Sequence, residues 1–257
     1  MNRRMRLNQI KEYIADKKRV KVAELSERFN VSNISIRQDL SILENEGFLV
    51  RSHGGAVLVE RAAVSADTRP ADNPALAFRL EKLRSIAEVA ANYINTDAWI
   101  FISTGLTGQE IAKKIMDRKL NVVTSGLNIA ILLAKSENTV MIPGGIVFKR
   151  QNDHTVAGDW YLRALSELSI AQVFLSISGV SLETGFSVEN PGEFLYMEKL
   201  KEISREIIVV FDSTKINERA FMSVADLTYA DTVITNKELP DAYRVYFREH
   251  GIKLLTD

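Results

Sequence analysis

The spacing of apolar residues predicts two helices in the first thirty residues. The first helix has its buried side chains three or four positions apart, as one helical face requires: Leu7, Ile10, Tyr13 and Ile14. We expect this helix to end near Lys17, because a basic segment over residues 17–21 breaks the pattern. A shorter helix is predicted over residues 22–29, with Leu25 and Phe29 on its buried side.

A third helix and a hairpin are predicted next. The helix is capped at Ser32 or Asn33, continues to Gly47 and passes through four apolar residues: Ile34, Ile36, Leu40 and Leu43. Two short helices about a three-residue turn form a helix-turn-helix. Beyond the third helix the apolar pattern changes to that of strands, at residues 48–50 and 56–59, around a pair of turn glycines. A small winged helix-turn-helix domain is therefore predicted.

In such a motif the later helix enters the major groove of DNA with its N-terminal side chains leading. Ile36, Leu40 and Leu43 take the inner face, which leaves polar residues on the other side. Arginine pairs with guanine and glutamine with adenine, whereas serine and asparagine bind phosphate or base. A solvated polar face and an inert hairpin edge are the alternatives. The predicted DNA-binding residues are Ser32, Asn33, Ser35, Arg37, Gln38, Ser41, Arg51, His53 and Gly54.

The rest of the chain has the pattern of a larger α/β domain. Residues 60–74 contain few large apolar side chains and two prolines, so we predict a linker between a domain at 1–59 and one at 75–257. A helix over residues 75–94 opens the second domain, and strands and helices then alternate, which is typical of a mostly parallel sheet. The predicted strands are 99–103, 120–124, 139–142, 173–178, 207–211, 232–235 and 252–255.

Loops after three of these strands are rich in small and hydroxyl residues: 103–107, 124–128 and 143–145. Ligands of open parallel sheets collect beyond the carboxyl ends of the strands. Free N–H groups at a helix start favour an anion there. Asp212 is a candidate to bond sugar hydroxyls, and Lys215 a candidate cation for a phosphate. Alternatively, each loop is a plain turn, Asp212 is a cap and Lys215 is a solvated charge.

The segment SNISIRQDLSILENEGFLVRSHGGAVL resembles the DNA-binding head of the DeoR family of bacterial sugar-metabolism repressors. That family has Arg-x-Asp-Leu in its recognition helix, then Leu-Glu, a glycine and an Arg-x-His-Gly-Gly-Ala wing. These residues are present as Arg37, Asp39, Leu40, Leu43, Glu44, Gly47, Arg51, His53, Gly54, Gly55 and Ala56. The body also resembles the family's sensor domain, which is similar in fold to ribose-5-phosphate isomerase and CoA-transferase-like domains.

The resemblance implies a phosphorylated sugar, or a similar intermediate, that weakens operator binding. With the loops above, it implies an effector site of Ser103, Thr104, Gly105, Leu106, Thr107, Thr124, Ser125, Asn128, Gly144, Gly145, Ser178, Gly179, Glu193, Asp212 and Lys215. The chain departs from the family at four positions. The family usually has an acidic residue at Ser103, threonine at Leu106, asparagine near Ser125 or Gly126, and lysine near Met197. These departures predict an altered ligand, or a sensor that has lost its ligand.

Charge and composition narrow the function classes. Residues 1–59 hold 11 Lys+Arg against 7 Asp+Glu, and the remaining residues hold 22 against 26. Chance unevenness is one explanation, but a basic head on an acidic body is expected when only the head approaches phosphates. The chain has no cysteine and its three histidines are far apart, so we expect neither a metal nor another cofactor. No apolar run approaches the ~20 residues of a membrane span, so a cytoplasmic protein is expected.

We therefore predict a repressor of a carbohydrate-metabolism operon that is not an enzyme. Its expected partners are double-stranded operator DNA, a small phosphorylated sugar and further copies of itself, as a homodimer or homotetramer. The main rival is a phosphosugar isomerase, in which Glu193, Asp212 and Lys215 would supply a base and a charge stabiliser. An enzyme, however, has no evident use for the N-terminal head. A head that binds protein instead of DNA is a third possibility.

Overall fold

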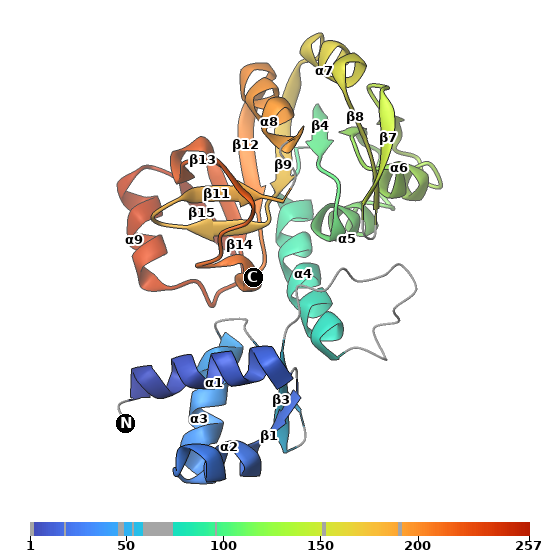
Figure 1. The fold of residues 1–257 in the computed structure, drawn as a ribbon. Coiled ribbons are helices and arrows are strands. Elements are labelled where there is room, and N and C mark those ends of the chain that lie inside the picture. The colour runs from blue at the N-terminus through green and yellow to red at the C-terminus, as the bar shows by residue number, and fades with distance from the viewer. Residues whose placement is uncertain are drawn as a thin grey trace. The chain divides into compact units, whose positions relative to one another are not determined.

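The structure is a computed structural model that describes residues 3–17, 19–45, 49–52, 54–58, 74–95, 97–150, 153–189 and 192–257. It divides the chain into two compact units, Met1–Glu81 and Lys82–Asp257 (Figure 1). Most of the predicted linker, residues 60–73, lies outside the described residues. The domain limits at residues 59 and 75 therefore stay predictions.

The first unit has the elements of a winged helix-turn-helix. In chain order they are α1 (Arg3–Lys17), β1 (Arg19–Lys21), α2 (Val22–Phe29), α3 (Asn33–Asn45), β2 (Leu49–Ser52) and β3 (Gly55–Leu58). The helices lie where the apolar spacing predicted them, because each buries one stripe of side chains. The fully buried core of this unit includes Ile10, Ile14, Leu25, Ile36, Leu40 and Leu43.

The strand β1 was not predicted, because the segment that contains it was taken only as a break between helices. It pairs antiparallel with β3 and gives the strand order β1-β3-β2. Gly55 permits this pairing, since a Cβ atom there would lie 2.2 Å from the carbonyl oxygen of Val20. The turn itself uses Gly54, whose φ is +78°. The two glycines therefore do different things, and only one of them turns the chain.

The second unit is built on a seven-stranded sheet in the order β15-β14-β12-β9-β4-β5-β6, and every neighbouring pair in it is parallel. This confirms the α/β fold with a mostly parallel sheet. Its strands are β4 (Trp99–Ile102), β5 (Asn121–Thr124), β6 (Thr139–Met141), β9 (Ile170–Ser176), β12 (Ser204–Val210), β14 (Thr232–Thr235) and β15 (Lys253–Thr256). The longer helices are α4 (Pro74–Tyr93), α5 (Leu106–Lys114), α6 (Leu127–Leu133), α8 (Gly192–Ile203) and α9 (Asp241–Glu249).

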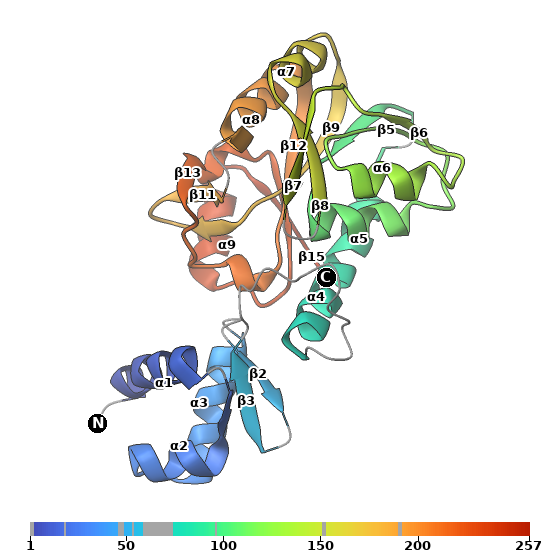
Figure 2. The same ribbon diagram turned by 45° about the vertical axis from the view of Figure 1, so that its right-hand side comes forward.

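Several shorter elements lie outside this sheet and were not predicted. β7 (Ile146–Arg150) and β8 (Asp153–Ala157) form an antiparallel pair, and the two strands lie side by side in Figure 2. A second small sheet contains β10 (Gly179–Ser181), β11 (Gly185–Val188) and β13 (Met222–Ala225). The remaining elements are α7 (Asp159–Ser166), η2 (Ser213–Lys215) and η3 (Leu227–Tyr229).

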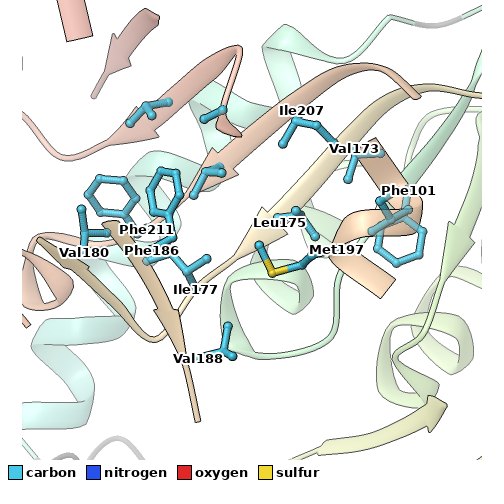
Figure 3. Close-up of a cluster of buried hydrophobic side chains, with 14 of the residues drawn as sticks. Phe101, Val173, Leu175, Ile177, Val180, Phe186, Val188, Met197, Ile207 and Phe211 are labelled. Carbon is cyan, nitrogen blue, oxygen red and sulfur yellow. The ribbon is translucent and has the colours of Figure 1, made fainter. Parts of the chain in front are cut away.

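Apolar side chains of β4, β9, β12, α8 and the small sheet form one buried cluster (Figure 3). Met197, near which the family resemblance led us to expect a lysine, belongs to this cluster beside Leu175 and is 3% exposed. The chain passes from β4 outward through β5 and β6, and then returns to place β9 on the other side of β4. The carboxyl ends of β4 and β9 therefore mark the topological switch point, where open α/β sheets bind their ligands.

Candidate DNA interface and effector site

The third helix presents most of the predicted DNA-binding side chains to solvent. Ser32, Asn33, Arg37 and Gln38 are exposed, and Ser35 and Ser41 are half-buried. The opposite face is buried in the core of the head, as predicted. Ile34 differs from the other apolar residues of this helix, because it is 68% exposed and belongs to the outer face.

Ser32 caps this helix. Its hydroxyl accepts a hydrogen bond of 3.2 Å from the backbone N–H of Ser35 and lies 3.0 Å from the Ser35 hydroxyl. Helix α3 begins at the next residue, Asn33, so the alternative between Ser32 and Asn33 as the cap is resolved in favour of Ser32. A cap of this kind fixes the direction in which the helix leaves the turn.

Asp39 of the Arg-x-Asp-Leu motif is a structural residue of the head. Its carboxylate is fully buried and accepts from Arg6 Nε at 2.6 Å and from Arg3 Nε at 3.1 Å. The hydrogen bond to Asp39 raises the pKa of the Arg6 guanidinium above its ordinary value. These contacts join α1 to α3 across more than thirty residues of sequence.

A second ion pair joins the wing to α3. Arg51 Nε lies 2.6 Å from Glu44 Oε2, and the backbone N–H of Arg51 donates to Glu44 Oε1 at 2.9 Å. Both residues belong to the motif that resembles the DeoR head. Gly54 is exposed and its carbonyl accepts from the N–H of Val22 at 2.9 Å. His53, the remaining predicted residue of the wing, lies outside the described residues.

In the second unit the parallel sheet brings the predicted effector loops to one edge. Ser103 follows β4, and its hydroxyl lies 3.1 Å from the hydroxyl of Ser176, at the end of β9. Thr124 donates its hydroxyl to the carbonyl of Ile102 at 2.7 Å and accepts from the N–H of Gly126 at 3.0 Å. The polar groups at the switch point thus bond to one another across neighbouring strands.

Asp153 was missed by the sequence analysis. This carboxylate of β8 is 5% exposed and accepts from Thr104 Oγ1 at 2.6 Å and from the N–H of Gly105 at 2.9 Å. It occupies the N-terminal end of α5, where an anion is favoured. The carboxylate of Asp153 therefore reaches the loop that contains Ser103, where the family resemblance led us to expect an acidic residue. Its contact partners lie 48 and 49 residues earlier in the chain, so no local pattern could have revealed it.

The other predicted effector residues lie in varied surroundings. Leu106 and Thr107 open α5, Asn128 is in the first turn of α6, and Glu193, 6% exposed, is in the first turn of α8. Ser125 and Gly179 are buried and Ser178 is half-buried, whereas Gly144 and Gly145 are exposed after β6, an edge strand. The predicted residues thus range from buried positions at the ends of the central strands to exposed glycines after the edge strand.

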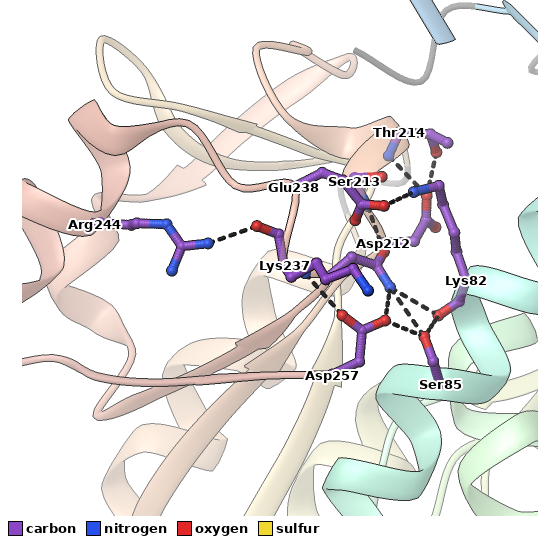
Figure 4. A network of polar contacts seen from close by, with 10 residues as sticks. Lys82, Ser85, Asp212, Ser213, Thr214, Lys237, Glu238, Arg244 and Asp257 are labelled. Carbon is purple, nitrogen blue, oxygen red and sulfur yellow. Dashed lines mark hydrogen bonds and ion pairs between the residues drawn. The ribbon is translucent and has the colours of Figure 1, made fainter. Parts of the chain in front are cut away.

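The loop from Asp212 to Lys215 is tied to helix α4 by a polar network (Figure 4). Asp212 accepts from the N–H of Thr214 at 2.9 Å, so it does cap the short helix η2. Asn236 connects the two elements. Its Oδ1 accepts from the N–H of Ser213 at 2.9 Å, and its Nδ2 donates to the carbonyl of Lys82 in α4 at 3.1 Å.

Asp257 completes this network. Its carboxylate accepts from Ser85 of α4, from Asn236 Nδ2 at 2.9 Å and from the N–H of Lys237 at 2.8 Å. Partial burial by itself raises the pKa of Asp257, but the three hydrogen bonds outweigh it and the pKa is below the ordinary value. A charged carboxylate therefore holds the ends of β14 and β15 against α4.

Two further features bear on function. In the described part of the chain, no group of three or more histidine, aspartate or glutamate side chains is placed to hold a metal ion. None of the helices that the structure describes has both the length and the apolar character needed to cross a bilayer.

The chain has partial similarity to solved structures. Ribose 5-phosphate isomerase A from Neisseria gonorrhoeae is 18% identical with a TM-score of 0.41, over 55% of each chain. The delta subunit of eIF2B from Chaetomium thermophilum is 15% identical with a TM-score of 0.45, over 65% of this chain and 63% of the other.

Sequence relatives cover nearly the whole chain. The HTH-type transcriptional regulator YulB of Bacillus subtilis (strain 168) is 32% identical over 92% of this chain and 90% of its own length. The glycerol-3-phosphate regulon repressor of Escherichia coli (strain K12) is 28% identical over 99% of both chains. The HTH-type transcriptional regulator IolR of B. subtilis is 26% identical over 96% of this chain and 97% of its own. These relatives are named as regulators of transcription.

Two family descriptions match the two parts of the chain. Residues 6–62 match the DeoR-like helix-turn-helix domain, and residues 79–237 match the DeoR C-terminal sensor domain. Together these matches contain most of α1, all of α2 and α3, and most of the parallel sheet. The chain therefore belongs to the DeoR family of DNA-binding transcriptional regulators.

Proposed function

We propose that this regulator represses an operon of carbohydrate metabolism by binding an operator with α3 and the wing. The observation that carries the proposal is the outer face of α3, where Arg37 and Gln38 are exposed above a buried apolar stripe. The E. coli relative that represses the glycerol-3-phosphate regulon supports the choice of pathway class. The protein acts in the cytoplasm, as a homodimer or homotetramer whose paired heads contact half-sites spaced by whole turns of DNA.

Operator binding is tested by Arg37→Ala. If Arg37 reads a base, the substitution weakens operator binding by about 2 kcal/mol, measured by gel shift on the operator found by genome-wide mapping of bound sites. Arg248→Ala, an exposed arginine of α9 in the sensor, is the matched control and leaves the affinity unchanged. Equal operator affinities of the wild type and Arg37→Ala would show that Arg37 does not contact a base.

The second part of the proposal is that a phosphorylated sugar binds at the switch point and weakens operator binding. Hydroxyls of Ser103, Thr104 and Ser176 and the carboxylate of Asp153 supply the acceptors and donors that a sugar requires. Lys215 supplies the cation for the phosphate. The carboxylate of Asp153 accepts a hydrogen bond from the N–H of Gly105. A ligand anion at this helix start must therefore displace Asp153.

The network around Asn236 supplies a route by which this binding reaches the head. Asn236 bonds the loop that contains Lys215 to α4, and α4 follows the segment that leads from the head. A ligand alters operator affinity only if it binds the two arrangements of the protein with different affinities. We therefore expect the effector to change the bonds that Asn236 makes to α4.

The effector is sought with a panel of sugar phosphates and glycerol 3-phosphate, each tested for release of operator DNA. Lys215→Ala abolishes the response to the active compound and leaves operator binding intact. Lys119→Ala, an exposed lysine of the sensor, is the control and keeps the response. If Lys215→Ala responds like the wild type, the phosphate does not bind at Lys215. If no compound of the panel acts on the wild type, the effector class is wrong.

A further inference from the structure

Ile34 is an apolar residue on a polar surface. It is 68% exposed, while Ile36, Leu40 and Leu43 of the same helix are fully buried. A helix turns by about 100° per residue, so Ile34 points almost opposite to that buried stripe. Gln38 and Ser41, at i+4 and i+7, share its face, and Arg37 lies at the border of this face.

Ile34 differs from an ordinary exposed apolar residue in its position near the start of α3. Single apolar side chains at the surface are common and need no explanation by themselves. Ile34, however, is the second residue of α3, and the N-terminal residues of a recognition helix are those that contact base edges. In the major groove the thymine C5-methyl is an apolar group that no other base presents.

We infer that Ile34 contacts a thymine methyl group in the operator and is a determinant of its sequence. The inference rests on the proposed binding of an operator by α3. DNA is favoured over a protein surface because Arg37 and Gln38 flank Ile34 with hydrogen-bond donors suited to guanine and adenine. The head also carries the excess of basic residues, 11 against 7 acidic over residues 1–59.

The experiment uses the full-length protein and removes only the methyl group. The wild type first selects its preferred duplex from a random DNA library. Each thymine of that duplex is then replaced singly by deoxyuridine, which lacks the methyl, and Kd is measured by fluorescence anisotropy. For the wild type, replacement of one thymine in each half-site weakens binding about fourfold, the value expected for one buried methyl group.

Substitutions of Ile34 connect this loss to the side chain. Ile34→Ala binds the thymine and deoxyuridine duplexes equally, and Ile34→Val keeps most of the difference. Met5→Ala removes another exposed apolar side chain of the head, in α1, and keeps the full difference. Because Ile34 is exposed, thermal melting of the variants is expected to match that of the wild type.

The outcomes separate this inference from the proposed function. The role of Ile34 is overturned if removal of the thymine methyl weakens binding by Ile34→Ala as much as it weakens binding by the wild type. The role is also overturned if the wild type binds equally well with deoxyuridine at every thymine position. Ile34 would then be a candidate contact for a protein partner. If the wild type selects no sequence at all, the operator binding proposed above fails, independently of Ile34.

Discussion

The head and the sensor expose their predicted binding residues very differently. In the head, Arg37 and Gln38 are exposed on the outer face of α3. In the sensor, Ser103 is 2% exposed, Thr124 0% and Asp212 1%. Ser103 and Thr124 bond to neighbouring strands, and Asp212 accepts from Thr214 in its own turn. The two head side chains project to solvent, whereas these three sensor side chains are buried and hydrogen-bonded within the protein.

This difference matches the two kinds of ligand. A DNA duplex is large and stiff, and it is recognised by side chains that already project from a helix. A small metabolite is recognised by buried groups, and those groups must be hydrogen-bonded when the ligand is absent because an unpaired buried polar group is costly. Under the proposed function, an effector that binds among these groups exchanges their hydrogen bonds, and such an exchange can move the elements that carry them.

Like the sensor residues above, Asp39 of the head is a buried polar group with partners inside the protein. Removing its partner Arg6 should cause the largest loss of stability. Arg6→Met leaves the fully buried Asp39 carboxylate with less compensation. We expect the free energy of unfolding of the head to fall by about 3 kcal/mol, measured by hydrogen exchange of α1 and α3 in increasing urea. Arg3→Met removes the partner that is 51% exposed and costs less than about 1 kcal/mol. Equal losses in the two variants would show that burial does not decide the energy of this pair.

The buried carboxylate of Asp153 tests how much its hydrogen bonds stabilise the loop after β4. Asp153→Ala leaves the hydroxyl of Thr104 and the N–H of Gly105 without their acceptor. The free energy of unfolding of the sensor should fall by about 2 kcal/mol, and amide protection of Gly105 should fall with it. Asp159→Ala, at an exposed position in the first turn of α7, is the control. Unchanged amide protection of Gly105 would mean that the bond to Asp153 does not stabilise this loop.

The smallest expected loss of stability concerns the hydroxyls of α3 in the head. Ser32→Ala removes the cap of α3 and should lower the stability of the head by about 1 kcal/mol, measured by thermal melting. Ser41→Ala, a half-buried serine later in the same helix, should change it by less than about 0.5 kcal/mol. If both variants bind operator DNA with wild-type affinity, these hydroxyls are not among the contacts of the outer face.

The predicted elements that agree with the structure are those with a strong local pattern. Helices α2 and α4, the strands of the parallel sheet and the loops at its carboxyl edge all agreed within a few residues, because apolar spacing and turn residues act over short stretches of chain. Short elements such as β1 and the pair β7–β8 were missed. Three to five residues are too few to show a period, and pairing with a distant strand is what stabilises them.

The sequence by itself determined the DeoR resemblance, the polar face of α3 and the edge of the sheet at which the effector loops meet. Only the tertiary structure decided that Asp39 joins two helices and that Asp153 reaches the loop of Ser103. Both depend on contacts between residues far apart in the chain. Such contacts follow from packing of the whole domain, and local pattern does not contain them.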